Sequence, residues 1–103
     1  MRFNTKRGDT RTALKATLTP VDAVFTDVAT VDFRMCTRQF ENVINRAVNV
    51  FSAPDVTVVF TASEIDREGV FLGEFKLTFT DGRIETIPKE DYIRIYIDKK
   101  AGD

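Results

Sequence analysis

Four residues near the middle of the chain have the spacing of a calcium-binding loop. Positions 1, 3, 5 and 6 of the twelve-residue template are held by Glu64, Asp66, Glu68 and Gly69. The template also requires a carboxylate at position 12, where this chain has Phe75. Because the ligand set is incomplete, we interpret Glu64–Glu68 as a solvated loop and predict no metal.

Other catalytic and metal-binding arrangements are excluded by residue types. The chain has no histidine and one cysteine, Cys36, so it lacks the ligands of an ordinary zinc site and the base of a Ser–His–Asp triad. No glycine-rich phosphate loop occurs, and the acidic residues form no pattern that indicates a cleft. We interpret Cys36 as a small, partly buried apolar residue. The sequence therefore predicts a protein that is not an enzyme and has no cofactor.

One candidate for binding lies near the end of the chain, where Tyr92, Arg94 and Tyr96 alternate with isoleucines. On a strand these three side chains would point the same way. Tyrosine and arginine are enriched at the energetic centres of protein interfaces. The alternative is an outward strand face beneath a loop.

A second candidate is the basic N-terminal segment. Residues 1–18 carry five basic side chains against Asp9, a net charge of +4, while the rest of the chain is acidic. The candidate contact residues are Arg2, Lys6, Arg7 and Arg11. They could dock on an acidic neighbour, including another copy of the chain, or contact phosphate. The alternative is a solvated edge strand, where basic side chains discourage unwanted pairing.

Composition favours one small domain built from strands. The chain has 103 residues, nine phenylalanines, no tryptophan and a net charge of −1. That charge argues against binding nucleic acid through overall charge, and we predict no specific nucleic-acid partner. We expect no signal peptide, no membrane span and, without a disulfide, folding in a reducing cytoplasm.

The strongest structural signal is a hairpin from Gly69 to Pro88. Alternation puts Phe71, Gly73, Phe75, Leu77 and Phe79 on one face, and Glu74, Lys76 and Thr78 on the other. The dipeptide Asp81-Gly82 then predicts a tight turn and a return strand.

Similar alternation predicts further strands at 12–19, 28–36, 56–60 and 92–97, with 21–27 as a connection or short strand. We expect residues 1–8 to form an arm and residues 98–103 a tail around a single domain. Seven or eight short antiparallel strands with regular turn signals predict an all-β, immunoglobulin-like β-sandwich.

Residues 37–51 fit two interpretations. Their apolar residues have the spacing of an amphipathic helix that Thr37 would cap. They are also rich in β-branched residues, and Asn45-Arg46 could form a turn between two short strands. The residues by themselves favour the helix.

The layout resembles the immunoglobulin-like domain at the N-terminus of phage baseplate upper proteins, and related small Ig-like structural proteins of tailed bacteriophages. The matching segments are Gly8-Asp9-Thr10, the Leu14–Leu18 strand, Ala29–Met35, the apolar pairs of 43–48, Gly69–Arg83 and Thr86 with Pro88. They span about residues 8–97. The resemblance also favours strands over a helix within 37–51.

The resemblance implies a non-enzymatic structural protein of the virion, assembled in the host cytoplasm. In that family the domain usually precedes a longer assembly or receptor-binding region. This chain of 103 residues has no room for such a region, so we expect an adaptor or connector. Its partners would be other virion proteins of the baseplate, tail, neck or capsid surface, in symmetric copies. A different class is also open: a stand-alone Ig-like module that binds a carbohydrate or another ligand.

Overall fold

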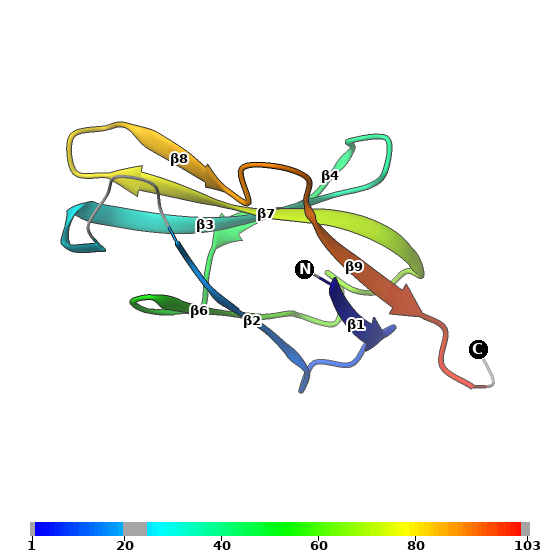
Figure 1. Cartoon of the computed structure of the whole chain (residues 1–103). Helices are drawn as coiled ribbons and strands as arrows, with labels where there is room; N and C mark the ends of the chain where they lie inside the picture. The colour runs from blue at the N-terminus through cyan, green and yellow to red at the C-terminus, as the bar shows by residue number, and fades with distance from the viewer. Residues whose placement is uncertain (1, 20–24, 102–103) are drawn as a thin grey trace.

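The protein is a sandwich of two β-sheets, seen in a computed structural model that describes residues 2–19 and 25–101 (Figure 1). The large sheet has the order β1-β9-β7-β3-β4, with β8 also paired to β7, and the small sheet has the order β2-β6-β5. The strands are β1 (Arg2–Lys6), β2 (Ala13–Thr17), β3 (Val28–Cys36), β4 (Asn42–Ala47), β5 (Val50–Ser52), β6 (Asp55–Val59), β7 (Gly69–Phe79), β8 (Ile84–Ile87) and β9 (Ile93–Asp98). The predicted all-β sandwich is confirmed.

Strand β7, which the alternation in its sequence predicted, lies inside the large sheet and pairs along both of its edges. One edge pairs with β3 along most of its length. The other edge pairs with β9 over Gly69–Gly73 and with β8 over Phe75–Thr78. The predicted turn closes the hairpin: the Gly82 N–H donates to the Phe79 carbonyl at 2.9 Å, and Gly82 has a φ of 87° that suits glycine.

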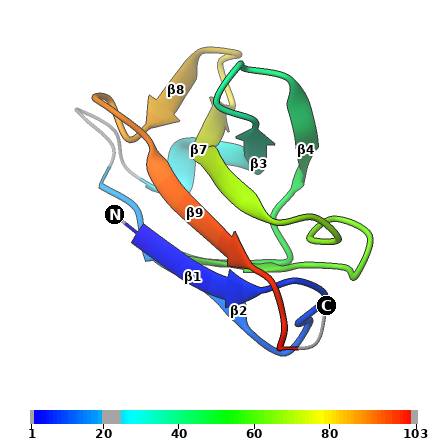
Figure 2. The same cartoon turned by 90° about the vertical axis from the view of Figure 1, so that its right-hand side faces the viewer.

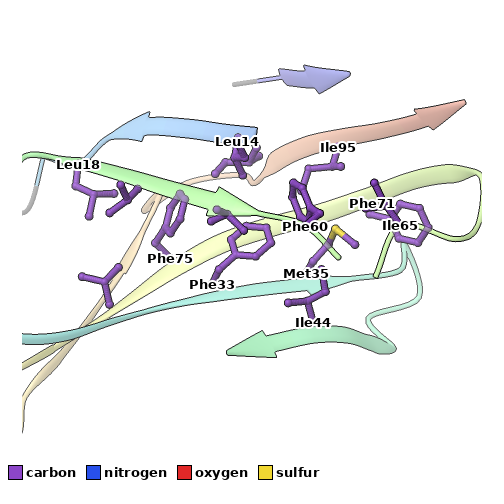
Figure 3. Close-up of a cluster of buried hydrophobic side chains, with 14 of the residues drawn as sticks. Leu14, Leu18, Phe33, Met35, Ile44, Phe60, Ile65, Phe71, Phe75 and Ile95 are labelled. Atoms are coloured by element: carbon purple, nitrogen blue, oxygen red, sulfur yellow. The ribbon is translucent and has the colours of Figure 1, made fainter. Parts of the chain in front are cut away.

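The core lies between the sheets and is built by alternate residues of their strands (Figure 3). Phe33 of β3 is at its centre, with ring centroids 5.4 Å from Phe75 and 6.0 Å from Phe60. The predicted inward positions of β3, β7, β9 and the segment 56–60 are buried, except Phe79, which is half-buried at the end of β7. The buried ones are Val31, Phe33, Met35, Val56, Val58, Phe60, Phe71, Phe75, Leu77, Ile93, Ile95 and Ile97. Period-two alternation therefore identified these faces correctly.

The N-terminal residues differ from the prediction. Arg2–Lys6, expected within an arm, form β1, which pairs with β9 in parallel and raises the number of strands among the described residues to nine. The segment is held because alternate side chains face inward: Thr5 is buried, and the ring centroid of Phe3 lies 5.8 Å from that of Phe60. The remaining strand pairs are antiparallel, as predicted.

Residues 37–51 form strands, so the helical interpretation is wrong. Asn45 and Arg46 lie inside β4 and do not form a turn. The chain leaves the large sheet after Val48, whose N–H donates to the Val31 carbonyl at 3.1 Å, and the Asn49 N–H then donates to Thr57 of the small sheet at 3.0 Å. Pairing with β3 and β6 satisfies backbone groups that a helix would have satisfied internally.

Three connecting segments complete the description. Residues 20–24, part of the expected 21–27 connection, lie outside the described residues, and Phe25–Asp27 forms a short 3-10 turn, η1. At the other end, Lys100 Nζ lies 3.1 Å from the Asp9 carboxylate and joins the tail to the loop after β1.

None of the described helical residues forms a segment that could cross a membrane.

Candidate functional site

The predicted Tyr92–Tyr96 face lies on the outer side of the large sheet. Within β9, Ile93, Ile95 and Ile97 are buried, while Arg94 is exposed and Tyr96 is half-buried. Tyr92 is half-buried immediately before the strand. The alternation of this segment was therefore predicted correctly.

Strand β1 brings a further predicted residue to this face. The parallel register puts Arg2 beside Arg94, and the Arg2 guanidinium carbon lies 3.9 Å from the centroid of the Tyr96 ring. The Arg2 Nε also donates to the Asn4 side chain at 3.1 Å. A cation over an aromatic ring at this distance is attracted by the negative face of the ring. Arg2 and Tyr96 therefore form one unit, although 94 positions separate them in the chain.

The sequence interpretation missed Phe40, which lies in the loop between β3 and β4. Its ring centroid is 6.0 Å from that of Tyr92, yet its side chain is 65% exposed. Its φ of 65° is rare for an aromatic residue, and its N–H donates to the Thr37 carbonyl at 2.9 Å. The helical interpretation of residues 37–51 would put Phe40 on the apolar face of the helix. The signal available in the sequence was a phenylalanine flanked by two polar residues, Gln39 and Glu41.

Arg94 is held in place by the carboxylate that precedes β9. Its Nη1 donates to Asp91 Oδ2 at 2.7 Å, and both side chains are accessible to solvent. This hydrogen bond holds the pKa of Asp91 below its ordinary value and raises the pKa of Arg94. At neutral pH the pair is fully charged, with its remaining hydrogen-bonding groups open to a partner.

An open polar hollow of about 340 Å³ lies beside Tyr92. It is lined by Glu74, Thr86, Pro88, Lys89, Asp91 and Tyr92. We call Phe40, Tyr92, Arg94, Tyr96 and Arg2 the aromatic–arginine surface. The surface offers aromatic area, two guanidinium groups and a hydrogen-bonding hollow, which together suit recognition of a partner.

The other predicted basic residues lie away from this surface. Lys6 is exposed opposite Asp98, at the other end of β1 from Arg2. The Arg7 side chain pairs with Asp66 at 3.3 Å, and its N–H donates to the Asp98 carbonyl at 2.9 Å. Arg11 is exposed in the segment before β2. The N-terminal cations therefore do not form one surface, because β1 is extended and holds Arg2 and Lys6 at its opposite ends.

The segment Glu64–Glu68 is only partly the solvated loop that we predicted. Ile65 is fully buried, and Glu64 accepts from Arg46 Nε at 2.7 Å and from Nη2 at 3.0 Å. The Arg46 hydrogen bond, more than any other cause, lowers the pKa of Glu64. Asp66 and Glu68 are exposed, and the described carboxylates and thiol form no cluster that could hold a metal ion.

Cys36 is half-buried near the end of β3, as predicted. Burial raises the pKa of its thiol, and the Glu74 carboxylate adds to that increase. A raised pKa favours the neutral thiol, which is the weaker nucleophile. This agrees with the interpretation of Cys36 as a partly buried apolar residue.

No family model and no curated protein match this chain. A solved structure does, the crystal structure of CopC from Methylosinus trichosporium OB3b, with a TM-score of 0.54. The chain is similar to CopC in fold. The match covers 95% of this chain and 84% of CopC at 10% sequence identity, so it shows the fold alone: an immunoglobulin-like β-sandwich. This agrees with the fold predicted from the strand pattern.

Proposed function

We propose that this chain is a non-enzymatic structural protein of a tailed-phage virion that connects neighbouring virion proteins. The observation that carries the binding role is the aromatic–arginine surface on the outer face of the large sheet. The virion setting rests on the resemblance of residues 8–97 to small Ig-like phage proteins. In this proposal the chain is assembled into particles in the host cytoplasm, in symmetric copies.

The physical case for a protein partner rests on Phe40. An aromatic side chain that is 65% exposed, on a backbone with a φ of 65°, costs free energy in the isolated protein. A partner that covers the ring would recover part of that cost as buried apolar area. Arg94 and Arg2 would supply charged hydrogen bonds around it, which is the usual arrangement of an aromatic anchor and arginines in an interface.

The test compares two arginines that each form an ion pair with a nearby aspartate. Arg94 and Arg83 each lie 2.7 Å from an aspartate, but Arg83 is on the turn between β7 and β8, away from the aromatic–arginine surface. We expect Arg94→Glu to reduce incorporation of the chain into purified phage particles at least tenfold, and Arg83→Glu to leave incorporation near that of the wild type. Quantitative immunoblotting of gradient-purified particles measures this. Electron microscopy that finds no density for the chain on any virion would overturn the proposal.

A second function, ligand or carbohydrate binding, is favoured by one specific observation. Tyr92 stands beside the polar hollow, and sugars are commonly bound by an aromatic ring next to hydrogen-bonding groups. A glycan array followed by calorimetry on the isolated chain distinguishes the two functions. Saturable binding that Tyr92→Ala abolishes would support this second function over the first.

A further inference from the structure

Strand β4 ends the large sheet on the side opposite β1 (Figure 2). The Val48 N–H points to β3, where it bonds to Val31 at 3.1 Å. Since alternate residues of a strand direct their backbone groups to the same side, Ile44 and Arg46 also face β3. The backbone groups of Asn45 and Ala47 therefore point to the free edge, and none of the described strands pairs with them there.

This edge lacks the features that usually prevent strands from pairing. Proteins protect free edges with short strands, with charged side chains or with proline. Among the described edge strands, β1 carries Arg2 and Lys6, β2 carries Lys15, β5 has three residues, and β8 has four residues followed by Pro88. Strand β4 has six residues, and its exposed side chains at Asn42, Asn45 and Ala47 are uncharged.

The one charged residue of β4, Arg46, is not available to protect the edge. Its guanidinium is bonded to the Glu64 carboxylate, to the Asn49 side chain at 3.0 Å and to the Val59 carbonyl at 2.7 Å. It also donates to the Ala47 carbonyl at 3.0 Å, which keeps a second lone pair. The charge of Arg46 is thus neutralised inside the protein, and the edge itself is neutral.

Exposed apolar side chains flank β4 at both ends. Phe40, two residues before the strand, is 65% exposed, and Val50, three residues after it, is 53% exposed. In an antiparallel pair of two β4 strands, the start of one strand lies beside the end of the other. Phe40 of one copy would then approach the β5 side of its neighbour, which carries Val50.

We propose that two copies of this chain pair antiparallel through β4, with a twofold axis at Asn45, and join their large sheets into one. In this register Asn45 lies opposite Asn45 of the second copy, Val43 opposite Ala47, and Ile44 opposite Arg46. No like charges face each other. The same arrangement about Asn4 of β1 would set Arg2 against Lys6, which is repulsive.

The oligomeric state in solution tests this interface. We expect the wild-type chain to sediment at about twice its 11.7 kDa mass when concentrated toward about 1 mM. Asn45→Lys puts two like charges opposite each other at the axis and should weaken the dimer at least tenfold. Thr30→Lys, which adds the same charge at an exposed position inside the large sheet, should dimerise like the wild type. Thermal unfolding of each variant checks that the fold is retained.

A crosslink tests the register itself. Residues directly opposite in a hydrogen-bonded antiparallel pair have Cα atoms about 5.5 Å apart, which a disulfide can span. In a Cys36→Ser background, Asn45→Cys should form a disulfide-linked dimer under mild oxidation, and Thr30→Cys should not. A wild type that stays monomeric throughout, or an Asn45→Lys variant that dimerises equally well, would overturn the proposal.

The dimer and the proposed virion contact are separable. The dimer rests on the backbone edge of β4, and the partner contact rests on the aromatic–arginine surface. Both contacts would touch Phe40, so the separation is tested at Arg94, which lies away from the β4 edge. Arg94→Glu should remain dimeric in solution while losing incorporation into particles. If dimerisation fails but the incorporation result holds, this inference is wrong and the proposed function stands.

Discussion

Arg46 and Glu64 form a bidentate ion pair that joins β4 of the large sheet to the turn after β6 of the small sheet. Arg46 Nε lies 2.7 Å from Oε2 and Nη2 lies 3.0 Å from Oε1. Glu64 Oε1 also accepts the Thr61 N–H at 2.8 Å, so the carboxylate orders its own turn. This pair holds together the side of the sandwich where the chain crosses from one sheet to the other.

Arg46→Lys should lower the free energy of unfolding by about 2 kcal/mol, because an ammonium cannot reproduce the fork that bonds Glu64 and Val59. Urea denaturation followed by circular dichroism measures this. Arg83→Lys is the control: its pair with Asp81 is exposed on a turn and screened by solvent, so the free energy of unfolding should stay close to that of the wild type. Equal effects of the two substitutions would contradict the role assigned to Arg46.

The contribution of Glu64 should depend on pH. The pKa of Glu64 is lowered in the folded protein from its ordinary value of 4.5, so the unfolded chain binds the proton more tightly. The stabilisation is therefore complete above about pH 4.5 and is lost as the pH falls through the folded pKa. We expect the difference in unfolding free energy between the wild type and Glu64→Gln to shrink from pH 6 to pH 3. A constant difference would show that the charge of Glu64 is not responsible.

Phe75→Ala should cost about 3–5 kcal/mol of stability, because Phe75 is 1% exposed and packs against Phe33 in the centre of the core. The midpoint of chemical unfolding reports the loss. The exposed Phe40 provides a matched control, since Phe40→Ala removes the same atoms from a site that is 65% exposed. A near-neutral Phe75→Ala would mean that the inward face of β7 is assigned wrongly.

Gly73→Ala should destabilise the protein although glycine is a poor strand residue. A Cβ at position 73 would lie 2.8 Å from Ile95 Cδ1 and 3.2 Å from the Phe33 ring, both of which are buried. The neighbours would have to move, at about 1–3 kcal/mol. Gly82→Ala tests a different cause: open space surrounds Gly82, so its cost would come from the positive φ. Relief of the Gly73→Ala loss by Ile95→Val would identify the clash.

Local patterns were sufficient for much of the fold. Alternation in β3, β7 and β9 identified their buried faces, and Asp81-Gly82 located the hairpin turn. These predictions succeeded because a strand that separates a core from solvent must alternate, whatever it pairs with. The Tyr92–Tyr96 face of the candidate site follows from the same rule.

Between residues 37 and 51 local patterns failed. The apolar spacing there suits a helix, but β3 and β6 supply hydrogen-bond partners that only the folded chain brings close. The exposure of Phe40 has the same origin, because the hairpin loop that carries it depends on β3 pairing with β4. Propensity is a weak guide wherever pairing with distant residues decides the outcome.

The sequence by itself determined the strands that alternate and a set of residue types without histidine. The tertiary structure decided which distant residues meet: Arg2 with Tyr96, Phe40 with Tyr92, and Arg46 with Glu64. The physical reason is that the alternation of apolar and polar residues in a strand depends only on which face of that strand is buried. Contacts between strands depend on their order and register, and these are set when the two sheets close around the core.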